Sequence, residues 1–332
     1  MSNGLGAAVV GCGLIGRKRA SVLEPGQLLA CADLNFDRAA KLSKEFGSEA
    51  FEDWKTAICH PGVNIVIVST SNNALSEVAE FSIQKGRHVI VEKPAARNKK
   101  ELSPLIRAAE EKGVCVRVGF NHRYHDAIRK AHDLASSGEI GPLMFIRGRY
   151  GHGGRVGYDK EWRADPTLSG GGEMIDQGVH LIDLSRWFLG DFSSVQGSAH
   201  TLFWDMPVDD NGFMLLKTSK QQVAFLQVSC TEWKNMFSLE IYGRDGKLQV
   251  DGLGGSYGVE RLTHYKMLPE MGPPDTTIWE YPRGDTSWRA EFEEFLEDIR
   301  LNRRPEANLE DALAALDVVE QIYKVSGYGH YA

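Results

Sequence analysis

A glycine-rich turn, GCGLIG, follows the first apolar run of the chain, AAVV, and opens a segment with helical spacing. Gly11, Gly13 and Gly16 therefore match the pattern G-x-G-x-x-G in a strand–turn–helix context. In that context the first glycine permits a tight turn, the second lets the backbone approach a pyrophosphate, and the third lets helix and strand pack closely. The N–H groups at Leu14 and Ile15 then face the anion. This motif predicts a dinucleotide-binding α/β fold for the first part of the chain.

Strand-like and helix-like segments alternate up to about residue 120. Five short apolar runs, AAVVGCG, LLACAD, NIVIVST, HVIVEKP and VCVRVGF, are typical of strands that are buried on both faces. The segments between them have apolar residues three and four apart and end in glycine, which predicts helices. Strand–helix alternation predicts a parallel sheet with right-handed crossovers, so we expect a Rossmann domain over residues 1–122.

The second part of the chain has a different rhythm. Six strand-like runs between about residues 142 and 251 follow one another with short links, and several alternate polar with apolar residues. The links KTSKQQ and GRDGK are typical of hairpin turns. We expect helices at 173–189, 286–302 and 309–325. Residues 123–332 are thus predicted to form an α+β domain with an open, mostly antiparallel sheet.

Asp33 ends the second strand-like run, about twenty residues after the glycine turn, where a carboxylate binds the ribose hydroxyls of a dinucleotide. Because such a carboxylate repels a 2′-phosphate, the sequence favours NAD over NADP, although Arg38 lies nearby in sequence. Thr70 and Asn72 follow the next long strand-like run and are candidate ligands of the ribose or the nicotinamide. They could equally be ordinary turn and cap residues.

Composition limits the class of protein. The 332 residues carry a formal net charge of −7, which argues against binding to nucleic acid. No run of 18 apolar residues occurs, so we expect no membrane span, and the first residues lack the pattern of a secretory signal. The five cysteines form no CxxC pair and no zinc spacing, so we expect free thiols and no metal site in a cytoplasmic protein.

Two opposite charges end the fourth long apolar run, HVIV. Glu92 and Lys93 are followed at once by Pro94, which restricts the conformation of the lysine before it. The predicted strand delivers Lys93 to the edge of the sheet where the nicotinamide of a bound dinucleotide would lie, and Glu92 is a candidate cofactor contact there. An ammonium at that place stabilises negative charge on a substrate oxygen as hydride leaves. A surface ion pair at a strand end is the structural alternative.

The second candidate cluster follows three glycines, Gly170 to Gly172. On the predicted helix behind them, Asp176, His180 and Asp183 are spaced i, i+4 and i+7 and share one face. A carboxylate one turn from an imidazole can orient it, and histidine suits general-base catalysis near neutral pH. A structural histidine, a capping aspartate and a metal pair are the alternatives. The glycines permit close approach of a ligand or of another chain segment.

Arginines and aromatic residues alternate over about 145–166. The arginines could recognise a carboxylate or phosphate, so one hypothesis is an anionic substrate; ordinary salt bridges are the other. Near residue 122, cofactor contact, substrate contact and packing remain equally open for the polar side chains. The candidate substrate residues of these two stretches are Asn121, Arg123, Tyr150, Arg155 and Arg163.

Together these segments resemble the Gfo/Idh/MocA family of glucose–fructose oxidoreductases and inositol dehydrogenases. The resemblance rests on the glycine turn, EKP at 92–94, GFNHRY at 119–124, GGGEMIDQGVHLID at 170–183 and LEIYGRDGKL at 239–248. It implies a catalytic trio of Lys93, Asp176 and His180, and a homodimer or homotetramer assembled through the sheet of the second domain. This chain departs from many members at Ser71 and Leu75, where a proline and a histidine are common.

The resemblance implies an NAD-dependent enzyme that interconverts a secondary alcohol and a ketone on a sugar, nucleotide sugar or cyclitol. Two other classes stay open at this stage. One is an enzyme that uses NAD without net redox change, such as a glycosidase or epimerase. The other is a non-catalytic NAD-binding regulator, which the presence of Lys93 and His180 disfavours.

Overall fold

The computed structural model of the chain describes residues 4–270 and 272–328 and contains two compact units. The first unit is made of the chain up to Phe120 together with Thr167–Gly170 and Trp288–Leu313. The second is made of Asn121–Pro166, Gly171–Ser287 and the chain from Ala314 onward. Two stretches that are remote in sequence therefore belong to the first unit. The division expected from the sequence places both of them in the second domain instead.

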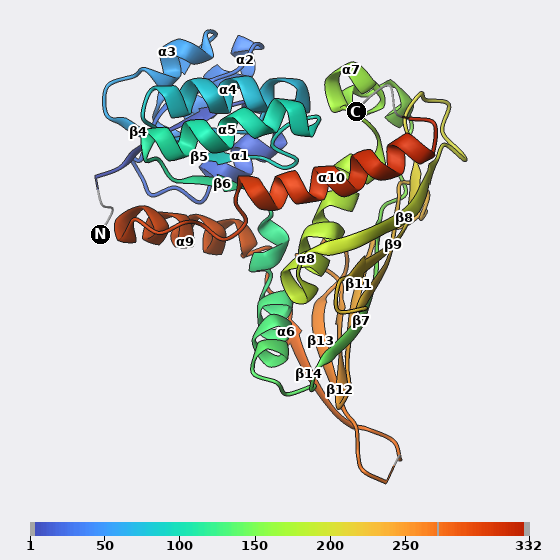
Figure 1. Cartoon of the computed structure of the whole chain (residues 1–332). Helices are drawn as coiled ribbons and strands as arrows, with labels where there is room; N and C mark the ends of the chain where they lie inside the picture. Colours follow the sequence, from blue (N-terminus) through green and yellow to red (C-terminus); the bar gives the residue numbers. More distant parts are fainter. Residues whose placement is uncertain (1–3, 271, 329–332) are drawn as a thin grey trace. The chain divides into compact units, whose positions relative to one another are not determined.

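The first unit contains a six-stranded parallel sheet in the order β3-β2-β1-β4-β5-β6. Figure 1 labels three of its strands, β4, β5 and β6. Its strands are β1 (Gly6–Val10), β2 (Leu28–Ala32), β3 (Glu49–Phe51), β4 (Val63–Val68), β5 (His88–Val91) and β6 (Val116–Val118). The strand order changes direction between β1 and β4, and open parallel sheets bind ligands beyond the carboxyl ends of their strands at such a point. The glycine turn, Thr70 and Lys93 follow β1, β4 and β5, so all three lie at this edge of the sheet.

Helices connect these strands. The connecting helices are α1 (Leu14–Ala20), α2 (Phe36–Phe46), α3 (Trp54–Ile58), α4 (Asn72–Gln84) and α5 (Lys99–Lys112). A further helix of this unit, α9 (Ser287–Leu301), comes late in the sequence. Gly47 and Gly113 end α2 and α5 in the left-handed conformation, with φ of 73° and 61°. The glycine stops predicted from the sequence are confirmed at both helices.

The core of the first unit is built on β1, β2 and β4, whose residues are almost all buried. Burial of both faces explains why these strands read as continuous apolar runs rather than alternating ones. Phe292 and Phe295 of α9 are 3% and 0% exposed and pack in the same cluster as Val9, Cys31 and Ile67. A helix from near the end of the chain is therefore part of this core.

The second unit contains an eight-stranded sheet in the order β14-β13-β12-β11-β7-β10-β9-β8. Its strands are β7 (Leu143–Gly151), β8 (Phe192–His200), β9 (Asn211–Thr218), β10 (Val223–Ser229), β11 (Met236–Gly243), β12 (Gly246–Asp251), β13 (Glu260–Lys266) and β14 (Asp275–Tyr281). Neighbours pair antiparallel except β7 and β10, which pair parallel. The predicted mostly antiparallel sheet and both predicted hairpins are confirmed.

Helices cover one face of this sheet. They include α6 (Asp126–Ser136), the π-helix Met174–Gly178, α8 (Val179–Leu189) and α10 (Leu309–Val325). Short helices of this unit occur at Asn121–Tyr124, Tyr158–Lys160 and Trp162–Ala164, whereas α7 (Pro166–Ser169) belongs mostly to the stretch assigned to the first unit. Helix α8 packs on β7 and β10, and α6 packs on β12, β13 and β14. The helix expected at 173–189 thus begins with a wider π turn, a feature that is frequent at functional sites.

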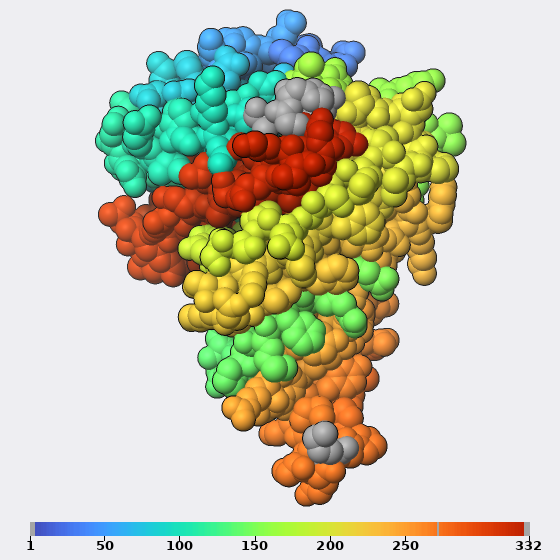
Figure 2. Space-filling model, turned by 45° about the vertical axis from the view of Figure 1, so that its right-hand side comes forward, coloured from blue at the N-terminus to red at the C-terminus, as the bar shows by residue number. Residues whose placement is uncertain are grey.

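The other face of the sheet is open. Phe145, Leu215 and Phe225 lie on it, 38%, 43% and 51% exposed, on the adjacent strands β7, β9 and β10. Strands β13 and β14 form a hairpin, orange in Figure 2, that lies at the surface, and β14 is largely exposed. In the part of the chain that the structure describes, no helix is both long and apolar enough to cross a membrane.

Candidate cofactor and active site

The three glycines of the turn after β1 differ in the space that surrounds them. Gly11 has φ of +93°, and a Cβ there would lie 2.5 Å from the carbonyl oxygen of Ser69. A Cβ on Gly16 would lie 1.9 Å from the carbonyl oxygen of Gly11. Gly13 differs, because a Cβ there would meet no atom within 4 Å. Packing within the protein therefore explains Gly11 and Gly16, whereas the space over Gly13 is open to a ligand.

The N-terminus of α1 is prepared for an anion. Gly13 is its N-cap and contributes no side-chain hydrogen bond, and the first backbone bond within the helix runs from Arg17 N to Gly13 O. The preceding N–H groups, including those of Leu14 and Ile15, therefore have no intrahelical partner. Such groups bind phosphate, so these residues fit the pyrophosphate of a dinucleotide.

Asp33 lies beside this turn, immediately after β2. Its Oδ2 accepts a hydrogen bond from Cys12 N at 2.8 Å, and its Oδ1 accepts one from Asn35 N at 2.9 Å. A carboxylate accepts about four hydrogen bonds, so capacity remains for ribose hydroxyls. The two backbone bonds fix the carboxylate next to the glycine turn, which fits the role predicted for it.

Asn72 and Thr70 stand after β4 as expected, but their side chains have partners within the first unit. Asn72 is 5% exposed, and its Nδ2 donates to the carbonyl oxygen of Ser169 at 2.8 Å. Thr70 Oγ1 donates to the carbonyl oxygen of Ser71 at 3.1 Å. Asn72 therefore holds the segment Thr167–Gly170, and a direct cofactor contact of either side chain stays a prediction.

The segment after β5 begins with a buried glutamate. Glu92 is 8% exposed and its Oε1 accepts a hydrogen bond from Arg19 Nε at 2.7 Å. Lys93 is half-buried, the Lys93–Pro94 peptide bond is cis, and Ala95 has φ of 72°. The cofactor contact proposed for Glu92 stays a prediction, because the structure places its carboxylate on an arginine that the sequence did not single out.

In the second unit, the carboxylate of Asp176 lies against Arg163. Asp176 Oδ2 accepts a hydrogen bond from Arg163 Nε at 3.0 Å, and Asp176 is 9% exposed. The guanidinium also lies over the ring of Trp162, 4.6 Å from its centroid. The charge of Asp176 raises the pKa of Arg163. Arg163 was a candidate for binding a substrate anion, but in the structure it binds a carboxylate of the protein.

His180 is 4% exposed and stacks on a second imidazole, that of His122. Their ring centroids are 3.8 Å apart and their planes differ by 24°. Asn121 Nδ2 donates to Ser287 Oγ at 2.9 Å, which turns Asn121 Oδ1 toward His122 Nδ1 at 3.3 Å. Asn121 thus links the second imidazole to Ser287. Sequence reasoning missed His122, although it quoted the GFNHRY segment that contains it.

A buried glutamate precedes Asp176 on the same segment. Glu173 is 1% exposed; its Oε1 accepts a hydrogen bond from Tyr158 Oη at 2.7 Å and lies 3.4 Å from His152 Nε2. Burial opposes the charged form of His152, but the hydrogen bond to Glu173 raises its pKa. Burial also raises the pKa of Tyr150 well above its usual value, so its hydroxyl stays protonated. These groups form a polar, aromatic lining around the start of the helix.

The glycine run before this helix allows close approach of another chain segment. A Cβ on Gly172 would lie 1.8 Å from the carbonyl oxygen of Asp209, and one on Gly171 would lie 2.3 Å from Tyr323 Oη. The buried carboxylate of Asp209 accepts hydrogen bonds from Gly172 N at 2.9 Å, Met174 N at 2.8 Å and Tyr323 Oη at 2.6 Å. The backbone at the start of this helix is thus fixed by Asp209, which lies just before β9.

The other charged candidates of the second unit are also paired with carboxylates. Arg123 forms a two-pronged, buried contact with Asp183, at 2.8 and 2.5 Å, so Asp183 serves this ion pair. Arg155 forms a similar but exposed pair with Glu161, at 2.6 and 2.7 Å. Arg147, on the open face of the sheet, binds Glu240. These pairs match the salt-bridge interpretation of the arginine-rich stretch.

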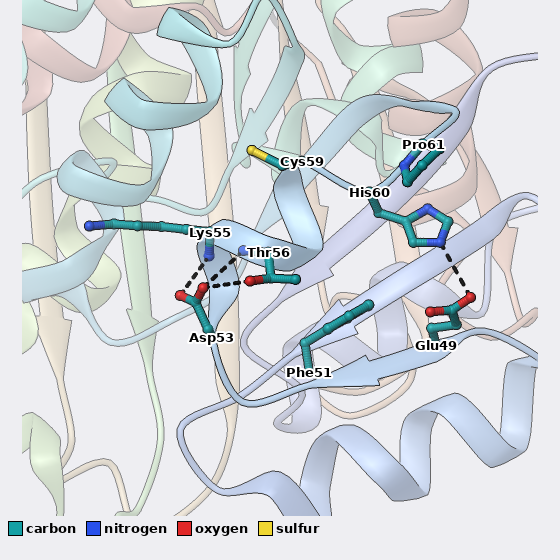
Figure 3. Close-up of a pocket in the computed structure, with 8 residues that line it drawn as sticks. All are labelled: Glu49, Phe51, Asp53, Lys55, Thr56, Cys59, His60 and Pro61. Carbon is teal, nitrogen blue, oxygen red and sulfur yellow. Dashed lines mark hydrogen bonds and ion pairs between the residues drawn. The ribbon is translucent and has the colours of Figure 1, made fainter.

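An open pocket in the first unit lies away from the edge just described. It is lined by β3, α3 and the loop that follows, as Figure 3 shows. Asp53 caps α3 through Lys55 N and Thr56 N, and His60 Nε2 lies 3.5 Å from Glu49 Oε1. The pocket is thus separate from the edge of the sheet that carries the glycine turn, Thr70 and Lys93. Among residues 4–270 and 272–328, no group of three or more histidine, cysteine or acidic residues is arranged to hold a metal ion.

Comparison with known proteins agrees with this geometry. Residues 5–120 match the family model described as an oxidoreductase family with an NAD-binding Rossmann fold, and residues 128–249 match the Gfo/Idh/MocA C-terminal domain. The chain is 30% identical to a levoglucosan dehydrogenase of Pseudarthrobacter phenanthrenivorans over 56% of its length, but this match spans only 49% of that protein. It is 26% identical to the scyllo-inositol 2-dehydrogenase (NAD⁺) of Bacillus subtilis, over 96% of this chain and 93% of that one.

Solved structures have the same fold. Levoglucosan dehydrogenase in complex with NADH and levoglucosan has a TM-score of 0.86 at 20% identity, covering 99% of this chain and 98% of that one. GenD2 from gentamicin A biosynthesis, in complex with NAD, has a TM-score of 0.83 at 25% identity, covering 98% and 95%.

Fold, glycine turn and matched models define an oxidoreductase with an NAD-binding Rossmann domain. The two family models together match more than half of the residues, and the chain belongs to the Gfo/Idh/MocA family.

Proposed function

We propose that this protein is an NAD-dependent dehydrogenase that interconverts a secondary alcohol and a ketone on a neutral sugar or cyclitol. The observation that carries the proposal is the open space over Gly13 at the uncapped start of α1, in a chain that retains Lys93, Asp176 and His180. A regulator that only binds NAD would have no need of a lysine, a carboxylate and an imidazole together.

The residues that would hold NAD are the glycine turn, the first N–H groups of α1 and Asp33. Bound NAD⁺ supplies the acceptor for hydride from the substrate carbon. The N–H groups neutralise the pyrophosphate, and the fixed carboxylate of Asp33 selects free ribose hydroxyls over a 2′-phosphate. Both contacts would be made by groups that are already oriented in the first unit, so little ordering entropy is lost on binding.

We assign the proton chemistry to three side chains. The ammonium of Lys93 would donate a hydrogen bond to the reacting oxygen and stabilise its alkoxide character. The imidazole of His180 would take the hydroxyl proton, and its stack on His122 holds the ring plane during the transfer. Asp176 would orient the substrate hydroxyl and the imidazole. Arg163 supports this role because its guanidinium binds the Asp176 carboxylate and fixes its position.

The substrate we propose is uncharged. Arg123 and Arg155 each bind a carboxylate of the protein through two N–H groups, and Arg163 binds Asp176 through Nε, so much of their positive charge is already balanced within the protein. The lining around the catalytic segment consists instead of tyrosine, histidine and acidic groups, including Tyr150 and Tyr158. Hydroxyl and carboxylate groups of this kind suit the many hydroxyls of a sugar or cyclitol.

The open face of the eight-stranded sheet supports a homo-oligomer. Three large, exposed apolar side chains, Phe145, Leu215 and Phe225, lie on adjacent strands. Contiguous exposed apolar patches are typical of interaction sites. We propose that two copies associate through this face. Sedimentation of the wild type and of Phe225→Asp should show a higher-mass species for the wild type and a smaller one for the variant.

Turnover assays test the proposed chemistry. Purified protein is incubated with NAD⁺ and a panel of inositols, hexoses and anhydrosugars, and the absorbance of reduced nicotinamide is followed. Lys93→Met and His180→Asn should lose turnover and keep NADH binding, whereas Lys100→Met, at an exposed position of α5, should be unaffected. Substrate conversion without accumulation of NADH would instead favour an epimerase or glycosidase. Equal turnover in Lys93→Met would overturn the assignment.

A further inference from the structure

Arg19 of α1 is a fully buried guanidinium that holds two carboxylates. It is 1% exposed. Its Nε and Nη2 lie 2.7 and 2.6 Å from Glu92 Oε1, and its Nη1 binds Glu291 of α9. The ring of Trp288 covers the guanidinium, with its centroid 4.5 Å from Cζ. All four side chains belong to the first unit.

Glu92 is fixed at both its backbone and its side chain. Glu92 N donates to Val68 O at 2.9 Å, which continues the sheet beyond β5, and Glu92 O accepts from Ala95 N at 2.9 Å. Arg19 holds the carboxylate at the other end of the residue. Lys93 therefore starts from an anchored neighbour, although it stands outside the regular strand.

A glycine protects the contact between Arg19 and Glu92. A Cβ on Gly119, directly after β6, would lie 2.7 Å from Arg19 Nη2 and 2.9 Å from Glu92 Oε2. Any side chain at this position would push the two partners apart. The ion pair, and not a turn, thus explains why glycine stands at this position of the GFNHRY segment.

Arg19 binds the two carboxylates directly, and the charge of the buried Arg117 also acts on Glu291. Burial raises the pKa of Glu291, and both guanidinium groups oppose this change. Buried ion pairs of this kind stabilise a fold little more than apolar side chains of the same volume would. What such a cluster does supply is a fixed direction for each partner.

We propose that Arg19 is a positioning residue for Lys93, acting through Glu92. The guanidinium fixes the residue from which the Lys93–Pro94 segment departs, so the ammonium is held where the substrate oxygen reacts. This inference rests on the proposed function. It predicts that loosening the Arg19–Glu92 contact impairs turnover rather than cofactor binding.

The two carboxylates on Arg19 provide a matched pair of variants. Glu92→Gln and Glu291→Gln make the same chemical change at two partners of one guanidinium, but only Glu92 precedes Lys93. Glu92→Gln should lower kcat about 10- to 100-fold, the cost expected for misplacing a catalytic group by about 1 Å, with NADH affinity within about twofold of wild type. Glu291→Gln should lower the melting temperature to a similar extent and leave kcat within about twofold.

Two further variants keep the proposal testable if a glutamine variant folds poorly. Gly119→Ala leaves every charge in place and should reproduce the loss of kcat seen in Glu92→Gln. Arg19→Lys keeps the charge but cannot bind both carboxylates with a planar fork, and should give an intermediate kcat. Equal losses of kcat in Glu92→Gln and Glu291→Gln, or no loss in either, would overturn the proposal. Weaker NADH binding by Glu92→Gln at unchanged kcat would also overturn it, since Glu92 would then be a cofactor ligand.

A separate readout distinguishes failure of this inference from failure of the proposed function. If the wild type turns over no sugar or cyclitol, the proposed function fails. The rate at which an amine-specific reagent modifies Lys93, measured by mass spectrometry, then still reports how firmly the residue is held. That rate should change in Glu92→Gln and not in Glu291→Gln; equal rates in both variants would refute the positioning role.

Discussion

Replacing Gly13 with alanine should remove dinucleotide binding without harming the fold. Gly13 has φ of −74° and ψ of −161°, a conformation that alanine adopts, and a Cβ there would meet no protein atom within 4 Å. Alanine at an unstrained position gains about 0.4–1 kcal/mol by restricting the unfolded chain, and as an N-cap it costs about 0.5–1 kcal/mol relative to glycine. The free energy of unfolding should therefore change by less than about 0.5 kcal/mol.

The loss of affinity follows from what the methyl group displaces. It would occupy the open space over the turn and hold the pyrophosphate away from the N–H groups of α1. Losing one hydrogen bond to a charged group costs about 1.5–3 kcal/mol, so NADH should bind about 10- to 100-fold more weakly.

Thermal unfolding with and without NADH measures this effect. At about 100 times the wild-type Kd, NADH stabilises the wild type by about 2.7 kcal/mol, whereas a variant with 30-fold weaker binding gains only about 0.9 kcal/mol. Gly16→Ala is the matched control. Its Cβ would lie 1.9 Å from Gly11 O, so it should lower the unfolding free energy by about 1–3 kcal/mol even without ligand. Wild-type NADH affinity in Gly13→Ala would refute the reasoning, because the dinucleotide would then not approach this turn.

Three further outcomes follow from the geometry. Burial raises the pKa of Glu240, but hydrogen bonds from its cationic neighbours lower it to about 2, from 4.5. Because the pKa is lowered in the folded state, the carboxylate stabilises the fold above about pH 4.5, and this stabilisation disappears as the pH falls toward 2. Glu240→Gln should lower the free energy of unfolding by about 1–2 kcal/mol at pH 7, after allowance for solvent screening. In urea titrations, the difference between the wild type and the variant should shrink only on acidification. Arg163→Met should lower kcat/KM about 10- to 100-fold with NADH affinity retained, because Asp176 loses its guanidinium; steady-state kinetics measure this, and unchanged kcat/KM would contradict the role of the pair. Asp33→Ser should reduce the preference for NADH over NADPH by about tenfold or more in competition binding, since the carboxylate that repels the 2′-phosphate is gone; an unchanged preference would place that selection elsewhere.

Local patterns in the sequence were sufficient to predict five of the six strands of the first sheet. Its strands are buried on both faces and its glycines punctuate the helices, so each element carries its own signal. Strands β13 and β14 carried none, because they lie at one end of the second sheet and β14 is largely exposed. The short β3 and α3 were missed for the similar reason that three to five residues cannot show a period.

The candidate site residues could be proposed from the sequence, whereas the partners of their charged groups could not. Lys93, Asp176 and His180 follow recognisable motifs. The partners of charged groups are decided by the fold: Arg163 meets Asp176 across 13 positions, and Arg19 meets Glu92 across 73. Pairs separated by so many positions produce no periodic pattern in a single sequence. The hypothesis of an anionic substrate rests on arginines whose partners in the fold the sequence does not reveal.

Helix α9 has a consequence for how the protein is made. Phe292 and Phe295 fill the core of a sheet whose strands are all synthesised before residue 120. While the ribosome translates the intervening residues, that apolar surface stays unsealed and available to chaperones or to neighbouring nascent chains. A polypeptide released before about residue 300 would therefore leave its nucleotide-binding half incompletely folded, even though every glycine and acid of the cofactor motif had already been made.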